Sequence, residues 1–188
     1  MKFILSKGVN LVGSTSKQYD HSVGFHDIKP FNSKNDDFLL VHRFPIKNTQ
    51  FSDKIETEIC LWNYKNSKTE IIDKTNAWSW EQGSRLQWID ENTIVYNKIN
   101  NNELGCLVNN IKNNDKKFLD RPIYSLSKNN EFLSISFSYL WKVWKNYGYH
   151  LDEKINLRYS EDFYNHEGIF LCDFNNNSRL ILSIAEAI

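Results

Sequence analysis

Aromatic rings, side-chain amides and guanidinium groups recur in this sequence where loops are expected, and together they could bind a sugar. Flat aromatic rings bind the apolar faces of sugar rings. An arginine fork suits a carboxylate such as that of a uronic acid. We therefore expect an oligosaccharide ligand, and an acidic one would suit the arginines. The candidate ligand-binding residues are Trp78, Trp80, Gln82, Arg85, Arg121, Tyr147, Tyr149 and His166.

These candidates also have a structural interpretation. The tryptophans and tyrosines could pack between sheets, as Trp88 is expected to do from its place in an alternating polar and apolar segment. Arg85 could form a structural bridge with Glu81. Arg121 could do the same with Asp120. Substitution distinguishes the two interpretations. Replacing a core residue changes the stability of the fold, whereas replacing a binding residue changes the affinity for the ligand.

Metal and catalytic chemistry have weaker support in the sequence. The histidines form no HxH or HxxxH pair, so only folding could bring them together; they are His21, His26, His42, His150 and His166. The chain has no G-x-S-x-G elbow and no glycine-rich phosphate loop with a lysine. We expect no metal site and no cofactor in this chain, and the sequence identifies no catalytic residue.

Composition excludes several classes of partner. Lys+Arg and Asp+Glu both number 23, and this zero net charge argues against a general nucleic-acid binder. No stretch approaches the roughly 18 apolar residues of a membrane span, and residues 1–10 lack the apolar core of a signal peptide. The three cysteines lie far apart in apolar segments, which favours buried thiols in a reducing compartment. We expect a cytoplasmic protein.

Three segments share one pattern of an apolar strand, a turn of about four polar residues and a second strand with an apolar pair. The segments are 59–64 with 69–72, 106–111 with 116–119, and 169–174 with 179–182. Tyr64, Ile111 and Phe174 coincide when the segments are superposed. A second hairpin lies upstream of each, at 27–31 with 38–41, 85–89 with 93–96, and 123–126 with 132–135.

Four antiparallel strands repeated three times are typical of β-propeller blades. We predict an all-β fold, a single partial β-propeller domain over residues 1–188 with four-stranded antiparallel blades at about 20–75, 76–122 and 123–188. A sandwich of two sheets built from the same strands is the alternative. In a propeller, the loop between the second and third strands and the link to the next blade emerge on one face, so we expect the binding site there. These connections are 44–58, 97–103 and 136–168, with the links 73–84 and 120–122.

Several runs of residues resemble a known group of proteins. AWSWEQGSRLQW, IVYN, RPIYSLS, SFSYL, NYGY and GIFLCDF occur in the order found in bacterial β-propeller proteins similar to oligogalacturonate lyases and TolB-type (WD40-like) propellers. The resemblance covers about residues 20–188 and implies a ring of about seven blades, of which this chain would be the N-terminal half. The metal-binding residues of oligogalacturonate lyases lie in later blades. A divalent metal and any lyase-like activity would therefore require those blades.

Two functions follow as expectations. The first is recognition of an oligosaccharide on the loop-rich face. The alternative is a non-catalytic propeller that serves as a platform for protein partners. An incomplete ring would leave strand edges open, so we also expect self-association or a second chain to cover them.

Overall fold

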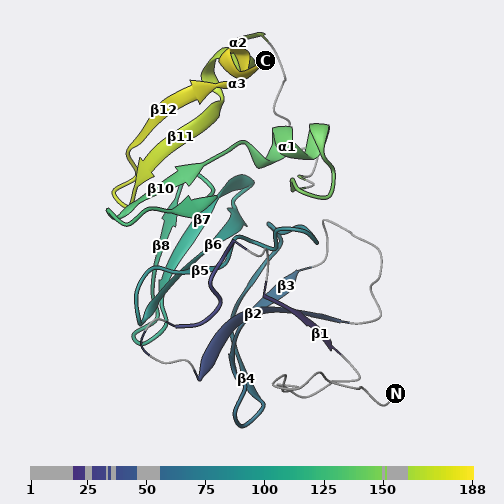
Figure 1. Ribbon diagram of the computed structural model, residues 1–188, viewed down its shortest axis with the longest axis vertical. Helices are drawn as coiled ribbons and strands as arrows, with labels where there is room; N and C mark the ends of the chain where they lie inside the picture. Colours follow the sequence, from purple (N-terminus) through teal and green to yellow (C-terminus); the bar gives the residue numbers. More distant parts are fainter. Residues whose placement is uncertain are drawn as a thin grey trace, which may run out of the picture.

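The chain folds into three four-stranded antiparallel sheets that follow one another in sequence order (Figure 1). The computed structural model describes residues 19–23, 27–32, 34, 37–45, 56–149, 151 and 161–188. The first sheet contains β1 (Tyr19–Ser22), β2 (Phe38–Pro45), β3 (Thr57–Asn63) and β4 (Lys68–Thr75). The second contains β5 (Gln87–Trp88), β6 (Thr93–Asn100), β7 (Glu103–Asn110) and β8 (Asp115–Leu119). The third contains β9 (Ser125–Leu126), β10 (Glu131–Ser134), β11 (Gly168–Asp173) and β12 (Ser178–Ser183).

The turn that joins the last two strands of each sheet is built in the same way. Asn63, Asn110 and Asp173 stand at equivalent positions, each just before the turn. The side-chain oxygen of each accepts hydrogen bonds from two backbone amides of its own turn, at 2.8 to 3.3 Å. These Asx-type turns explain why asparagine recurs at the turns of the repeat.

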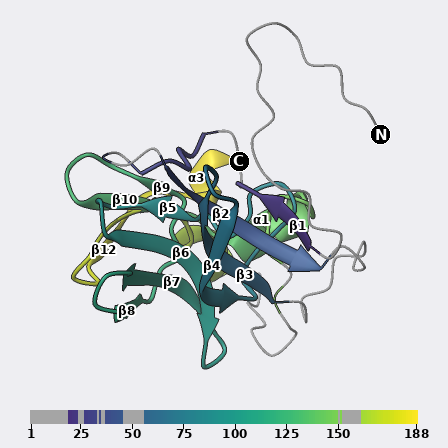
Figure 2. The same cartoon turned by 90° about the horizontal axis from the view of Figure 1, so that it is seen from below.

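The sheets pack face to face through two apolar clusters. Leu40 and Ile59 of the first sheet meet Ile94 and Tyr96 of the second in one buried cluster. The opposite face of the second sheet, which includes Cys106, packs against the third sheet in another cluster. Figures 1 and 2 show the second sheet between the other two. The prediction of an all-β fold with three four-stranded antiparallel units is confirmed, and the described strands form three sheets rather than the two of a sandwich.

Short helices occupy parts of the chain that were predicted as loop or strand end. The helices are α1 (Phe137–Val143), α2 (Glu161–His166) and α3 (Ile184–Ala187). Ser136 caps α1, because its hydroxyl accepts the amide of Tyr139. Ser183 and Glu186 form a reciprocal capping box at α3. The predicted loop 136–168 therefore contains α1 and α2, and the Ser136 cap begins α1 two residues after β10 ends.

The first strand of the first sheet was assigned to the wrong residues. The prediction placed it at 27–31, whereas β1 pairs with β2 through Tyr19–Ser22. The later segment touches the same sheet through a single bridge between Phe31 and Leu39. Pro30 has no N–H to donate to a ladder and supplies only its carbonyl, which accepts the amide of Leu40.

Two other expectations were also wrong in detail. The predicted loop 97–103 is a continuation of β6 and β7, which pair as far as Asn100 and Glu103 and leave a two-residue turn. The strand predicted at 85–89 shrinks to β5, because Arg85 adopts a left-handed backbone with φ of 55°. Within the predicted loop 44–58, residues 46–55 lie outside the described part of the chain.

The prediction of buried thiols is confirmed: Cys60, Cys106 and Cys172 are free and buried. Burial raises the pKa of Cys60 to about 12 and that of Cys172 to about 11. In the described residues, no helix combines the length and apolar character required to cross a bilayer.

Candidate functional site

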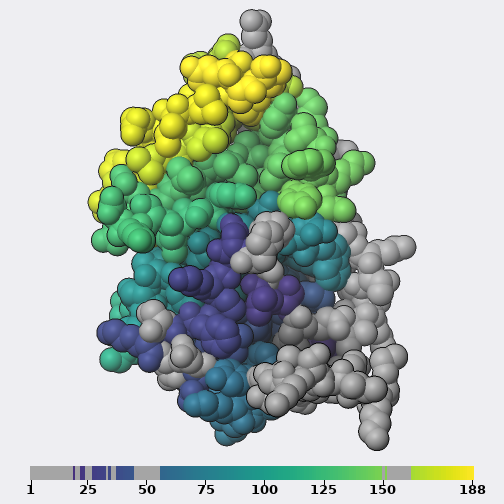
Figure 3. All heavy atoms as spheres, in the orientation of Figure 1, coloured from purple at the N-terminus to yellow at the C-terminus, as the bar shows by residue number. Residues whose placement is uncertain are grey.

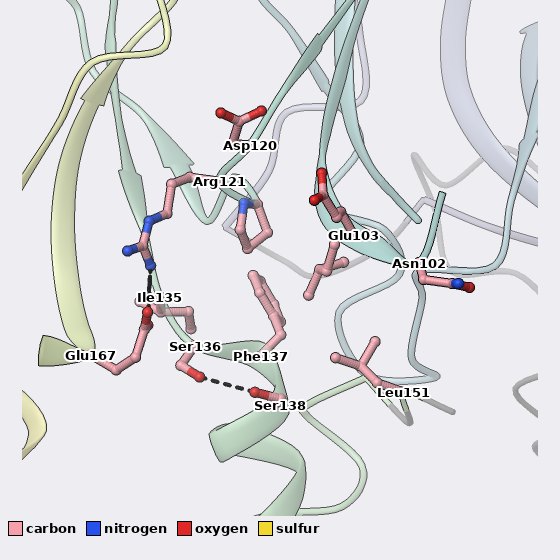
Figure 4. Close-up of a pocket in the computed structure, with 12 residues that line it drawn as sticks. Asn102, Glu103, Asp120, Arg121, Ile135, Ser136, Phe137, Ser138, Leu151 and Glu167 are labelled. Atoms are coloured by element: carbon pink, nitrogen blue, oxygen red, sulfur yellow. Dashed lines mark hydrogen bonds and ion pairs between the residues drawn. The ribbon is translucent and has the colours of Figure 1, made fainter. Parts of the chain in front are cut away.

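A pocket of about 500 Å³ opens between the second and third sheets (Figure 4). Its lining comes from the β6–β7 turn at 102–104, the link at 120–122 and the segment 135–138 that leads into α1, with Leu151 and Glu167. These segments belong to the connections that the blade pattern assigned to one face. Three of the five predicted connections, 97–103, 120–122 and 136–168, thus contribute to this pocket, whereas 73–84 and the described residues of 44–58 do not line it.

The β6–β7 turn presents polar groups to the pocket. Asn101 and Asn102 both have left-handed backbone, with φ of 49° and 65°. Two consecutive residues of this kind suit a two-residue hairpin turn, and asparagine tolerates the conformation. Glu103 follows at once on the exposed start of β7, and its carboxylate lies across the pocket from Arg121 and Glu167 (Figure 4).

Arg121 is held in place on one side of the pocket by Glu167. Its Nη1 donates to both carboxylate oxygens of Glu167, at 2.9 and 3.1 Å. The Cζ atom also lies 3.6 Å from the centroid of the Phe170 ring, a cation–π contact. The carboxylate partner is thus Glu167 and not Asp120, whose side chain instead accepts the amide nitrogen of Asn176.

The floor of the pocket is apolar, and buried aromatic rings support it. Phe137 is fully buried and stacks on Tyr149 with a centroid distance of 4.3 Å and nearly parallel planes. The Tyr149 hydroxyl accepts the side-chain amide of Asn97 at 2.8 Å. Burial raises the pKa of Tyr149 above its ordinary range. At the edge of this floor, the hydroxyls of Ser136 and Ser138 lie 3.1 Å apart (Figure 4).

Arg85, a predicted ligand-binding residue, lies in the interior. Its side chain is 0% exposed, and Nη1 and Nη2 donate to the carboxylate of Asp27 at 3.1 and 2.8 Å. Nε donates to the backbone carbonyl of Tyr124 at 2.7 Å. The bridge that was considered with Glu81 is therefore made with Asp27. All three nitrogens of the guanidinium group are engaged, which corresponds to the structural interpretation.

The tryptophan pair belongs to a separate aromatic cluster. Trp78 is buried and stacks on Phe44 with centroids 5.7 Å apart. Trp80 meets the same ring edge-on at 4.7 Å and is 41% exposed. Gln82 is buried in the adjoining turn, and its backbone N–H donates to the Ser79 hydroxyl. Trp78 and Gln82 are thus core residues, whereas Trp80 offers part of its ring to solvent.

The remaining candidates lie near the third sheet without lining the pocket. Tyr147 is half-buried, with its ring 5.4 Å from that of Trp144. Trp144 is 67% exposed and was not among the predicted binding residues. His166 is exposed at the end of α2, where Nε2 lies 3.2 Å from a carboxylate oxygen of Asp162.

The structure therefore brings few of the predicted residues together. Arg121 lines the pocket, and Tyr149 supports its floor through Phe137. Sequence reasoning did not identify six polar residues of the lining as binding candidates, namely Asn102, Glu103, Asp120, Ser136, Ser138 and Glu167. Their contribution depends on contacts between segments far apart in the chain, although the Asn-Asn turn before Glu103 could have indicated a projecting carboxylate.

Metal ligands do not cluster in the parts of the chain that the structure describes, where no group of three or more His, Cys, Asp or Glu side chains converges. His26 and His150 lie outside those residues. Comparison of the chain with protein-family models, with curated proteins and with solved structures finds no match.

Proposed function

We propose that the three sheets are consecutive blades of a β-propeller and that the pocket between the second and third binds a neutral oligosaccharide. The sheets support the first part, because each is a four-stranded antiparallel unit and each packs on the next in chain order. The pocket between two such units, on the face where the variable connections emerge, supports the second.

The composition of the pocket suits a sugar. Its volume of about 500 Å³ is within the range of small-ligand sites. The partly buried side chains of Leu104, Ile135 and Leu151, which pack against the cluster of the buried Phe137, offer an apolar floor, against which the CH-rich face of a sugar ring can lie. Around that floor stand the Glu103 carboxylate, the Asn102 amide and the serine hydroxyls, which can pair with sugar hydroxyls.

The charges favour a neutral sugar over an acidic one. Three carboxylates line the pocket, those of Glu103, Asp120 and Glu167, against the single cation of Arg121. Because Arg121 is already paired with Glu167, a uronate would meet a net negative surface. Sugar hydroxyls, in contrast, donate to carboxylates in charge-assisted hydrogen bonds. The arginines that suggested an acidic ligand both have carboxylate partners of their own.

Calorimetric titration with a neutral disaccharide, such as cellobiose, and with digalacturonate tests the proposal. We expect the neutral disaccharide to bind and digalacturonate to bind more weakly. Replacing the carboxylate by an amide in Glu103→Gln should weaken binding of the neutral disaccharide about tenfold, because one charge-assisted hydrogen bond is worth about 1.5 kcal/mol.

The matched control is Glu70→Gln, which removes a carboxylate from an exposed position on β4 of the first sheet. Its affinity should equal that of the unsubstituted protein. Tighter binding of digalacturonate would reverse the assignment of ligand charge. No binding of either sugar, or equal loss in both variants, would remove the pocket as the binding site.

A further inference from the structure

Trp144, at the end of α1, is the most exposed of the six tryptophans, with 67% of its surface open to solvent. Its ring lies 5.4 Å from that of Tyr147, and the two planes are tilted by 37°. We name this pair of rings the aromatic tip. An indole ring that stays in water contributes little to the hydrophobic stabilisation of the fold, whereas it offers a flat apolar face to a ligand.

Backbone contacts fix the turn that carries the aromatic tip. The carbonyl of Trp144 accepts the amides of Tyr147 and Gly148, at 3.0 and 3.3 Å. Gly148 lies so close to α1 that an added Cβ atom would be 2.0 Å from a backbone nitrogen of the helix. The amide of Tyr149 then donates to the carbonyl of Phe137 at 3.2 Å, where the two rings also stack. The turn therefore holds the tip in place without burying the Trp144 ring.

The aromatic tip and the saccharide pocket lie at opposite ends of α1. Phe137 and Ser138 line the pocket at the start of the helix, and α1 leads away from the pocket beyond them (Figure 4). Trp144 follows Phe137 by about two helical turns, so the two residues lie on the same side of the helix, about 10 Å apart along its axis. From the tip the chain returns past Phe137 to Leu151, which also lines the pocket. Two adjacent segments thus connect the pocket with the tip.

The exposure of Trp144 is separate from that of the third sheet. An apolar groove of about 220 Å³ lies between α1 and this sheet, and its lining includes Tyr139 and Val143 but not Trp144. Tyr139 and Val143 are four residues apart and form one stripe of the helix, whereas Phe137 and Trp144 belong to another. Figure 3 shows the light-green surface of α1 and its turn beside the yellow surface of β12 and α3. An element that filled the groove would pack on the first stripe.

We propose that the aromatic tip is a second saccharide subsite, on which one ring of a longer chain stacks while the end of that chain occupies the pocket. This inference rests on the proposed function of the pocket and adds the length of the ligand to it. A distance of about 10 Å along α1 corresponds to about two sugar units beyond a disaccharide, so the ligand would be an oligosaccharide of about four units. The indole face of Trp144 would stack on the apolar face of a sugar, and its Nε1–H can donate to a sugar hydroxyl.

A membrane surface is the other ligand to consider, because the exposed Lys142 and Lys145 flank the aromatic tip. An interfacial anchor buries a broad apolar face among the lipids. The tip offers one indole ring, with Val143 beside it at 55% exposed, and Val143 belongs to the groove on the other stripe of α1. A flat surface of this size suits a single sugar ring better than a bilayer.

Calorimetric titration with cellobiose and with cellotetraose tests the proposal. We expect cellotetraose to bind about tenfold more tightly than cellobiose, because only the longer chain can stack on the tip. Trp144→Ala should remove this advantage and leave the affinity for cellobiose unchanged, and Trp144→Phe should retain part of the advantage. Because the Trp144 ring is mostly exposed, the thermal unfolding midpoint of both variants should stay close to that of the unsubstituted protein.

The control is Trp80→Ala, which removes the other exposed indole ring, in the link between the first and second sheets. It should change neither affinity. Cellotetraose that binds no more tightly than cellobiose, or an equal loss of both sugars in Trp144→Ala, would overturn the subsite and leave the pocket in place. Failure of both sugars to bind would remove the pocket and the subsite together. Binding to phosphatidylserine vesicles that Trp144→Ala abolishes, with no effect of this substitution on cellotetraose, would assign the tip to a membrane instead.

Discussion

At the level of single residues, folding strongly alters the titration of His42. It lies on β2 and is 2% exposed. Its Nε2 atom accepts the backbone amide of Ser84 at 3.1 Å and lies 2.8 Å from the Ser84 hydroxyl. Burial penalises the charged imidazolium and lowers the pKa of His42 from 6.5 to about 4. The neutral ring is thus part of the contact between the first and second sheets.

This pKa shift predicts a loss of stability in mild acid. Between about pH 6.5 and pH 4, the unfolded chain protonates His42 whereas the folded chain does not, so the free energy of unfolding rises with pH across this window. The contribution is complete above pH 6.5 and has been lost at about pH 4. Its size is about 3 kcal/mol, since one pKa unit corresponds to about 1.4 kcal/mol. Urea unfolding at several pH values measures this slope.

His42→Gln should reduce that slope, whatever its effect on stability at neutral pH. His166→Gln is the matched control, because His166 is exposed on α2 and its replacement leaves the buried ring in place. An unchanged slope in His42→Gln would mean that other groups produce the acid sensitivity. A reduced slope in His166→Gln would assign part of it to the surface.

At the level of elements, the turn from Ser79 to Arg85 is tightly constrained. Ser79 and Gly83 exchange backbone hydrogen bonds at 2.8 and 3.2 Å, and Gly83 has φ of 57°. A Cβ atom at Gly83 would lie 2.6 Å from Cε1 of His42. Both the backbone conformation and the space therefore require glycine.

We expect Gly83→Ala to lower the free energy of unfolding by about 2 kcal/mol, from left-handed backbone strain together with the displaced imidazole. Urea unfolding measures the loss. Glu81→Ala changes an exposed residue of the same turn and should stay within about 0.5 kcal/mol of the unsubstituted protein. Equal stability of the two variants would show that the turn can relax away from His42.

The elements that the sequence predicts well are those determined by local patterns. The apolar repeat locates β3 and β4, β7 and β8, and β11 and β12, because their Asx turns place the strand ends within a few residues. It mislocates β1, since residues 27–31 resemble a strand but form only an isolated bridge with β2, at Phe31. It also does not predict α1, whose start depends on the Ser136 cap.

The candidate pocket was predicted less completely than the strands. Its face followed from strand order, and Arg121 was among the candidates. Glu167 could not be identified as the partner of Arg121, because 46 residues separate them and only the packing of β11 beside the link after β8 brings them together. Arg85 and Tyr149 have suitable chemistry for binding, but burial removes them from solvent. Residue type indicates what a side chain can bind, and tertiary packing decides whether a ligand can reach it.

At the level of the whole molecule, Arg85 connects all three repeated units. It leads into β5 of the second sheet, and its guanidinium group binds Asp27 from the first unit and the Tyr124 carbonyl just before β9 of the third. The apolar clusters join the sheets in neighbouring pairs, whereas this one side chain touches both outer units. Its ion pair is asymmetric, because Arg85 is 0% exposed and the Asp27 side chain is 38% exposed.

That asymmetry predicts an order of stability among three variants. Asp27→Asn leaves a fully buried guanidinium group without its carboxylate and should lower the free energy of unfolding by about 3 kcal/mol. Adding Arg85→Met removes the stranded charge, so the double variant should be more stable than Asp27→Asn alone. Urea unfolding gives both values, and a lower m-value in Asp27→Asn would show that the units no longer unfold together.

Glu91→Gln, which breaks the exposed pair with Lys34, should change stability by less than about 0.5 kcal/mol. If the double variant is instead less stable than Asp27→Asn, the methionine fails to replace the packing and the carbonyl bond of Arg85, and the side chain acts mainly through those contacts and not through its charge.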